Sequence, residues 1–219
     1  WFVCSKGHAG PAVYSALAMK GFFPMSELNT LNRPGTRLPS HCDRLKTPGI
    51  DMTTGSLGQG ASTAAGIALA HQMNHKSNKV FLMLGDGEIN EGQVWEMALF
   101  AGTKKLNNLL AFVDYNKLQL DGPTCEICDV GNVAKKFEDF GWYAQDIDGH
   151  DVEAIDRAIE NARAQHEKPS MIVLNTIKGD GWSTVANKSS CHNLTISPAQ
   201  MEEALGEMNA ALKRIEEGE

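Results

Sequence analysis

Asp86 stands between two glycines directly after an apolar run, in the stretch FLMLGDGEINEG at residues 81–92. The run Val80–Leu84 is continuous, which is typical of a strand buried on both faces of a parallel sheet. Gly85 and Gly87 have no Cβ, so a ligand can approach this turn closely and the backbone can adopt a positive φ. A carboxylate here is an oxygen donor of the kind that Mg²⁺ binds together with phosphate oxygens. We therefore predict a site for a hard cation and a phosphorylated ligand at Asp86.

Two further oxygen donors follow the next predicted strand, Leu109–Asp114. Asn116 offers a side-chain amide oxygen, and Leu118 offers a backbone carbonyl. The distance along the chain from Asp86 to Asn116 corresponds to one strand–helix–strand unit, so the two strands are expected to be neighbours. In a doubly wound sheet, ligands bind beyond the carboxyl ends of the strands. These three groups are therefore the candidate metal ligands.

The elements that must position these groups alternate between strand and helix. Further strands are predicted at Trp142–Ile147 and Met171–Ile177, and helices at Ala61–Gln72, Val94–Lys104, Asp151–Glu167 and 197–217. Ser197 is the expected N-cap of the last helix. Its apolar stripe, which we expect to pack, consists of Met201, Leu205, Met208, Leu212 and Ile215. This alternation predicts an α/β fold with a doubly wound, mostly parallel sheet flanked by helices. Residues 33–54 show little periodicity, and a loop of that length is usually functional.

Composition excludes several classes of function. The chain has 219 residues, enough for one large α/β domain, with 20 basic and 27 acidic residues and a formal net charge of −7. No basic face is expected, so a nucleic-acid partner or an anionic membrane surface is disfavoured. No apolar run approaches the roughly 20 residues of a membrane-spanning helix. The five cysteines are scattered and no signal peptide is present, which indicates free thiols and a cytoplasmic location.

Some patterns are interpreted as structural. Cys125 and Cys128 form a C-x-x-C pair, but no second pair follows at zinc-finger spacing, so we expect no metal there. The glycines at 55, 58 and 60 lack the third glycine of a dinucleotide fingerprint, because position 63 is threonine. Four histidines have no motif context and are expected to be solvated side chains. They are His71, His75, His150 and His166.

Six segments, in the same order along the chain, resemble the transketolase family. They are SKGHAGPAVYSAL (5–17), HCDRLKTPGIDMTTGSLGQG (41–60), GDGEINEGQVWE (85–96), VDYNKLQLDG (113–122), FGWYAQDIDGHD (140–151) and KPSMIVLNTIKGDG (168–181). The resemblance extends from Cys4 to about His192. A single Gly-Asp-Gly is weak evidence, whereas six collinear segments are specific. The resemblance implies that residues 1–219 form one domain that binds the diphosphate of thiamine diphosphate.

The resemblance also implies roles for individual residues. The Mg²⁺ ligands would be Asp86, Asn116 and the carbonyl of Leu118, with Ca²⁺ or Mn²⁺ as substitutes. Cofactor contacts would come from His8, Gly55, Ser56, Leu57, Gly87, Asn116 and His192. The catalytic group would comprise His8, His41, His192, Glu91 and Glu96, with the two glutamates between the active sites of a dimer and able to share protons. Many relatives have proline where this chain has Ser56.

Transketolases transfer a two-carbon unit from a ketose phosphate to an aldose, and the thiazolium of the cofactor carries this chemistry. A glutamate of a second, pyrimidine-binding domain is also required, and this sequence ends at Glu219 without such a domain. We therefore expect the N-terminal subunit of a split transketolase. Its partner would be a C-terminal subunit, in a dimer of heterodimers that acts on sugar phosphates.

Alternatives remain at this point. Relatives begin well upstream of Trp1, so an incomplete or degenerate chain that only binds cofactor or another protein is one of them. A haloacid-dehalogenase-type phosphatase also has Gly-Asp-Gly after a strand, but its N-terminal Asp-x-Asp is not found. Within the thiamine diphosphate class, deoxyxylulose-phosphate synthase and dihydroxyacetone synthase are conceivable, although Lys46-Thr47-Pro48-Gly49 after His41 is more similar to transketolase.

Overall fold

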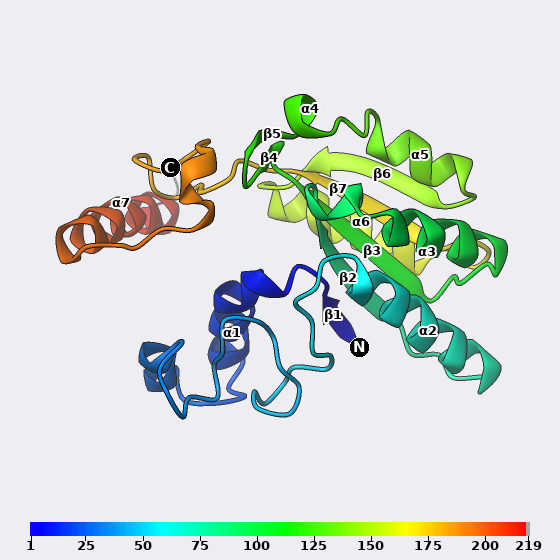
Figure 1. Ribbon diagram of the computed structural model, residues 1–219, viewed down its shortest axis with the longest axis horizontal. Helices are drawn as coiled ribbons and strands as arrows, with labels where there is room; N and C mark the ends of the chain where they lie inside the picture. Colours follow the sequence, from blue (N-terminus) through cyan, green and yellow to red (C-terminus); the bar gives the residue numbers. More distant parts are fainter. Residues whose placement is uncertain (218–219) are drawn as a thin grey trace.

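The computed structural model describes residues 1–217, which are built around a five-stranded sheet (Figure 1). The strands are β1 (Phe2–Cys4), β2 (Val80–Gly85), β3 (Leu109–Tyr115), β6 (Tyr143–Asp148) and β7 (Ser170–Asn175). They are arranged in the order β1-β2-β3-β7-β6, and every neighbouring pair is parallel. All five carboxyl ends therefore meet at one edge of the sheet. A short antiparallel hairpin of β4 (Leu118–Gln119) and β5 (Gly122–Pro123) follows β3 at this edge.

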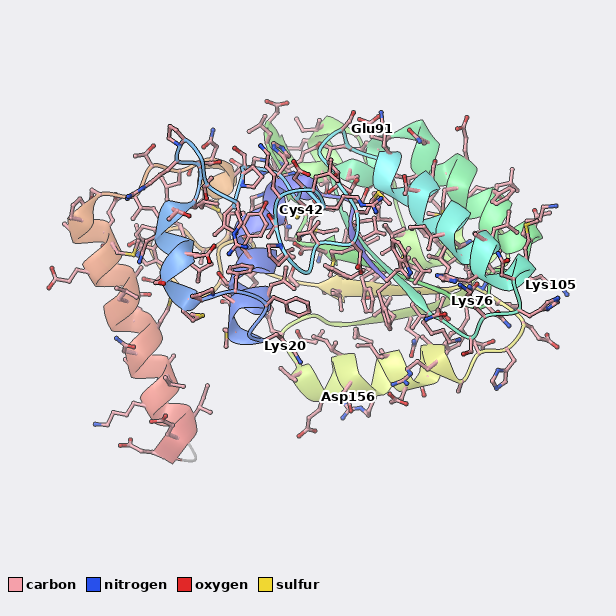
Figure 2. All side chains as sticks on the ribbon, turned by 90° about the horizontal axis from the view of Figure 1, so that it is seen from below. Lys20, Cys42, Lys76, Glu91, Lys105 and Asp156 are labelled. Carbon is pink, nitrogen blue, oxygen red and sulfur yellow. The ribbon has the colours of Figure 1, made fainter. Side chains whose placement is uncertain are left out.

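The helices are α1 (Gly10–Met19), α2 (Gln59–Met73), α3 (Gly92–Thr103), α4 (Thr124–Ile127), α5 (Val133–Asp139), α6 (Val152–Arg163) and α7 (Pro198–Glu217), with 3₁₀ turns η1 (Gly7–Ala9), η2 (Met25–Thr30), η3 (Glu88–Asn90) and η4 (Ser189–His192). The helices α2, α3 and α5 cover one face of the sheet, and α6 covers the other. In Figure 2, Asp156 of α6 lies on the opposite side of the sheet from Glu91 at the start of α3. The doubly wound, mostly parallel fold is therefore confirmed.

The central strand shows why the apolar runs are continuous. All five residues Leu109–Val113 of β3 are buried. Leu109, Ala111 and Val113 belong to the core under α2, α3 and α5, whereas Leu110 and Phe112 belong to the core under α6. Since each face of the strand packs on helices, no position in this run is free for a polar residue.

Several elements differ from those predicted. The strand β1 has only three residues at the start of the chain, too short to give a periodic signal. The helices α1 and α5 were not predicted either, because α5 has only seven residues and the apolar residues of α1 do not form one clear stripe. The helix α6 ends at Arg163, earlier than predicted, and β7 ends two residues before Ile177.

The last helix forms where the sequence places it, but its packing was wrongly predicted. The Ser197 hydroxyl oxygen accepts from the Gln200 N–H at 3.3 Å, and the Gln200 side chain accepts from the Ser197 N–H at 2.9 Å, a reciprocal cap. In Figure 1, α7 extends away from the sheet. Its apolar stripe is 47–71% exposed within the described chain; its members are Met201, Leu205, Met208, Leu212 and Ile215. None of the described helices has the length and apolarity needed to span a bilayer.

Candidate functional site

A cavity of about 1030 Å³ opens at the carboxyl edge of the sheet. Segments that follow all five strands contribute to its wall, and η4 adds to it. The charged, amide, hydroxyl and imidazole side chains that line the cavity are Lys6, His8, Asn32, Asp86, Glu88, Asp114, Asn116, Gln119, His150, Thr176, Lys178, Asp180, His192 and Asn193. The sheet topology thus brings together residues that are far apart in the sequence.

Asp86 is buried at the end of β2, with a relative exposure of 5%. Its two carboxylate oxygens accept from the backbone N–H groups of Gly87 at 2.7 Å and Lys117 at 2.5 Å. Lys117 has a φ of +67°, a left-handed conformation at the turn that follows β3. Burial raises the pKa of Asp86, and the two N–H donors oppose this shift. Each oxygen keeps a free lone pair, so the carboxylate can still bind a cation.

The other two candidate ligands lie on the neighbouring strand end. The Asn116 side-chain oxygen accepts from the Leu118 N–H at 3.1 Å. The Leu118 carbonyl accepts from the Lys178 ammonium at 3.1 Å. Within residues 1–217 no cluster of three His, Cys, Asp or Glu side chains could hold a metal. The candidate set is instead one carboxylate, one amide and one carbonyl, all oxygen donors of the type that Mg²⁺ prefers.

Two lysines bring positive charge to the cavity. Lys178 follows β7, and its ammonium also lies 2.9 Å from Nδ1 of His192. Lys6 follows β1 and forms an ion pair of 2.5 Å with Asp114, which also accepts a hydrogen bond from the Thr176 hydroxyl. Burial alone would raise the pKa of Asp114, but the Lys6 charge and these hydrogen bonds outweigh it and hold the pKa below its usual value.

The rings of His8 and His192 lie next to each other in the wall of the cavity, with centroids 5.2 Å apart. Burial, followed by the charges of His192 and Lys6, lowers the pKa of His8 to about 4. Burial and the Lys178 charge also lower the pKa of His192. Both rings are therefore neutral at pH 7. Because Lys178 donates to Nδ1 of His192, the proton of that ring is assigned to Nε2.

A buried carboxylate joins three loops beneath the cavity. Glu88 is 2% exposed, and its Oε1 accepts from the Ser5 hydroxyl at 2.5 Å and from the Gly58 N–H at 2.9 Å. Its Oε2 accepts from the Gly85 N–H at 3.1 Å. Burial raises the pKa of Glu88, and these three donors oppose the shift. Glu88 thus fixes the turn before α2 against the ends of β1 and β2.

The structure separates the sequence-predicted site residues into two groups. Those that line the cavity are His8, Leu57, Asp86, Gly87, Asn116, Leu118 and His192. Those that do not are His41, Gly55, Ser56, Glu91 and Glu96. The His41 ring is adjacent to Gly55, since a Cβ on that glycine would lie 3.5 Å from the ring. Glu91 and Glu96 are exposed at the start of α3.

Gly87 is expected from the sequence to contact the cofactor, and in this structure its N–H donates to the Asp86 carboxylate. A Cβ at Gly87 would lie 2.9 Å from Cβ of Gln119, so glycine is also required for the close contact with the β4–β5 hairpin.

Sequence reasoning missed Lys6, Glu88, Asp114 and Lys178. For the two lysines a signal was available: each is followed by glycine and comes shortly after a strand, in the segments SKG (5–7) and IKG (177–179). The expectation of solvated histidines was wrong for His71, which is half-buried with its ring centroid 6.3 Å from that of Trp1. His150 is exposed as expected, but its ring also contacts Asp180 and the Ile177 backbone, which the sequence did not indicate.

Comparison with known proteins decides the family. The sequence profile of the family described as "Transketolase, thiamine diphosphate binding domain" matches residues 1–209. The chain belongs to the transketolase family. This membership excludes a haloacid-dehalogenase-type phosphatase.

Relatives within the transketolase family include two proteins whose names describe them as subunits. The chain is 54% identical over 206 residues to the 6-deoxy-6-sulfo-D-fructose transketolase subunit SqwG of Clostridium sp. (strain MSTE9), and the match covers 94% of this chain and 75% of that protein. It is 34% identical over 215 residues to a subunit of the apulose-4-phosphate transketolase of Phocaeicola vulgatus, with coverage of 98% and 76%.

Among solved structures, the transketolase of Campylobacter jejuni superimposes with a TM-score of 0.88 at 28% identity. The superposition covers 95% of this chain and 34% of that one. The chain therefore spans three quarters of the subunit relatives and about a third of the solved transketolase.

Proposed function

We propose that this chain is the thiamine-diphosphate-binding subunit of a transketolase that transfers a two-carbon ketol unit from a ketose to an aldose. One observation carries the proposal: the buried Asp86 and the oxygens of Asn116 and Leu118 converge from adjacent strand ends on one cavity, in a chain of this family. This is the donor set that a magnesium diphosphate needs.

The residues present fit the cofactor's charged end. Asp86, Asn116 and the Leu118 carbonyl would hold Mg²⁺, with Ca²⁺ or Mn²⁺ as substitutes. The ammonium groups of Lys6 and Lys178 line the same cavity and would balance the negative charge of a diphosphate. The thiazolium of the bound cofactor would supply the carbon nucleophile for cleavage of the ketose.

The histidines of this chain would handle the sugar and its protons. His8 and His192 are neutral at pH 7. His8 can therefore donate one hydrogen bond and accept another, whereas His192, whose Nδ1 accepts from Lys178, can donate through Nε2. We assign them to the hydroxyl groups of the substrate and to the diphosphate. His41, adjacent to the turn at Gly55, would contact the sugar from the rim.

The remaining assignments concern the cofactor rings and the assembly. The turn formed by Gly55, Ser56 and Leu57 would support the rings, because Glu88 fixes this turn beside the diphosphate site. Glu91 and Glu96, exposed at the start of α3, would lie between the two active sites of a dimer and could share protons across that interface.

We further propose that the chain works in the cytoplasm with a C-terminal subunit that carries the pyrimidine-binding domain, in a dimer of heterodimers. The two relatives whose names describe them as subunits support the existence of a separate partner subunit. Their names specify a sulfosugar and a sugar phosphate, so the donor here would be a ketose with an anionic group. The described residues retain every candidate metal ligand, which disfavours a degenerate binding module.

The proposal is tested by reconstitution. This chain and a complementary protein with the pyrimidine-binding domain are assayed separately and together for aldose release from a ketose phosphate, with thiamine diphosphate and Mg²⁺. Activity is expected only for the mixture, and it should disappear with Asp86→Ala. Full activity of this chain alone would refute the division of the enzyme into two polypeptides, and an inactive mixture that binds the cofactor would refute ketol transfer.

A further inference from the structure

The turn after β6 makes an unusually close contact with the loop after β7. Gly149 donates its N–H to the Asn175 carbonyl at 2.8 Å. A Cβ at Gly149 would lie 2.5 Å from Cγ2 of Thr176, so only glycine permits this approach. The backbone of the next residue, His150, is held within this turn, because its N–H donates to the Asp148 carboxylate at 2.9 Å. The turn therefore presents the His150 ring to the loop that follows β7.

Both nitrogens of the His150 ring are engaged by that loop. Nε2 accepts from the Ile177 N–H at 2.8 Å, and Nδ1 lies 3.3 Å from the Asp180 carboxylate. An imidazole that accepts through Nε2 carries its proton on Nδ1, where it can donate to Asp180. The ring thus spans the loop from Ile177 to Asp180 and contacts it on both sides of Lys178.

Lys178 is the loop residue that reaches the candidate diphosphate site. Its ammonium donates to the Leu118 carbonyl and contacts Nδ1 of His192. Its own carbonyl accepts from the Asn187 N–H at 2.8 Å. Gly179, directly after it, has a φ of +74°, so the chain turns sharply at this point. With the Ile177 N–H released, the backbone before this turn would lose a fixed point.

We propose that His150 is a positioning residue: it fastens the loop after β7 so that the Lys178 ammonium is held at the diphosphate-binding edge of the cavity. This inference rests on the proposed function, because it assigns Lys178 to a diphosphate. His150 lines the same cavity but acts through the loop backbone. The Asp148-Gly149-His150 sequence then has one role, in which Gly149 permits the approach and His150 makes the attachment.

The first test measures the loop directly, without any ligand. Hydrogen exchange of the segment 176–181 is compared in the full wild-type chain, His150→Ala and His150→Gln. Exchange should increase in His150→Ala and return toward the wild-type rate in His150→Gln, whose amide oxygen can accept from the Ile177 N–H. The matched control is His166→Ala, an exposed histidine elsewhere. Unchanged exchange in His150→Ala would overturn the inference.

The second test asks whether His150 acts through Lys178. Calorimetry measures the affinity for pyrophosphate with Mg²⁺ in His150→Ala, Lys178→Met and the double variant. We expect a loss of about 3- to 10-fold for His150→Ala, the factor expected of one ordinary hydrogen bond. In the Lys178→Met background this loss should vanish, because the group that His150 positions is gone. In a Lys6→Met background, on a different loop, the loss should persist in full.

The outcomes separate the two proposals. A wild-type chain that binds no magnesium pyrophosphate contradicts the proposed function and this inference together. A wild-type chain that binds it, with His150→Ala equal in affinity or additive with Lys178→Met, overturns the inference alone and leaves the proposed function standing.

Discussion

Glu88 shows how a single buried side chain organises the site. Its carboxylate accepts three hydrogen bonds, from Ser5, Gly58 and Gly85, and it is shielded from solvent. Truncation would leave two backbone N–H groups without their acceptor. The free-energy penalty of burying a polar group without a hydrogen-bond partner is usually larger than the net stabilisation that one hydrogen bond provides.

We therefore predict that Glu88→Ala lowers the free energy of unfolding by about 2–4 kcal/mol, the range expected when a buried hydrogen-bonded network loses its acceptor. Urea unfolding measures this, with Glu138→Ala on the exposed face of α5 as the control, which should change little. Equal stability of the two variants would show that the three loops do not depend on Glu88.

His8 leads to a prediction about pH. Although its side chain is partly exposed, its pKa is lowered to about 4 in the folded chain, first by partial burial of the ring and then by nearby positive charge, against 6.5 for an unperturbed histidine. Between these values the unfolded chain binds a proton at this position and the folded chain does not. The free energy of unfolding therefore decreases as the pH falls from about 6.5 to about 4.

In His8→Gln this contribution is absent, so the loss of stability on acidification from pH 7 to pH 4.5 should be smaller than in wild type. Urea unfolding at the two pH values measures the difference. A wild-type pH dependence in His8→Gln would contradict the neutral His8 on which the proposed sugar contact rests.

At the scale of elements, two glycines inside helices have different surroundings, so the same substitution to alanine should have opposite effects on stability. A Cβ at Gly102 in α3 would lie 1.8 Å from the carbonyl oxygen of Phe140, a backbone atom that cannot move alone. A Cβ at Gly66 in α2 would meet nothing within 4 Å. The same substitution thus tests close packing at one position and helix propensity at the other.

We predict that Gly102→Ala lowers the free energy of unfolding by about 2 kcal/mol or more, as overpacking does. Gly66→Ala should raise it by roughly 0.5–1 kcal/mol, because alanine is the better helix former. Thermal or urea unfolding of the two variants measures both changes in the free energy of unfolding. Stabilisation by Gly102→Ala would mean that α3 does not lie against the segment at Phe140.

The sequence predicted those elements that have a strong local signal. The strands β2, β3 and β7 are continuous apolar runs, and α7 carries its own cap at Ser197, so each was found near its true position. The strand β1 has three residues and gains its stability by pairing with β2, which no local pattern reveals. The exposure of the α7 stripe was also beyond prediction, because periodicity shows that a face is apolar and not whether this chain covers it.

The candidate site was predicted only in part, for a similar reason. Consecutive strands tend to be neighbours, so the proximity of Asp86 and Asn116 follows from the strand–helix–strand pattern. Lys6 and Lys178 come from β1 and β7, and their approach to this pair depends on the strand order β1-β2-β3-β7-β6. That order is a property of the whole sheet. His150 was missed because its partners are a backbone N–H and a carboxylate of a distant loop.

At the scale of the whole molecule, five parallel strands direct their carboxyl ends, and the charges that follow them, toward one cavity. Oxygen donors that follow β2 and β3 are flanked by ammonium groups that follow β1 and β7. A cation held by the oxygens and an anion held by the lysines would each reinforce the other, which is the electrostatic requirement for a metal diphosphate. The account therefore depends on Mg²⁺ bound at Asp86.

The most direct measurement is calorimetric titration of thiamine diphosphate into the chain together with its complementary subunit, with and without Mg²⁺. We predict binding that requires Mg²⁺ and that weakens about 100-fold in Asp86→Ala, equivalent to about 2.7 kcal/mol. Asp156→Ala, on α6 across the sheet, should bind as wild type does. Identical titration curves for wild type and Asp86→Ala, or binding that is indifferent to Mg²⁺, would contradict the account.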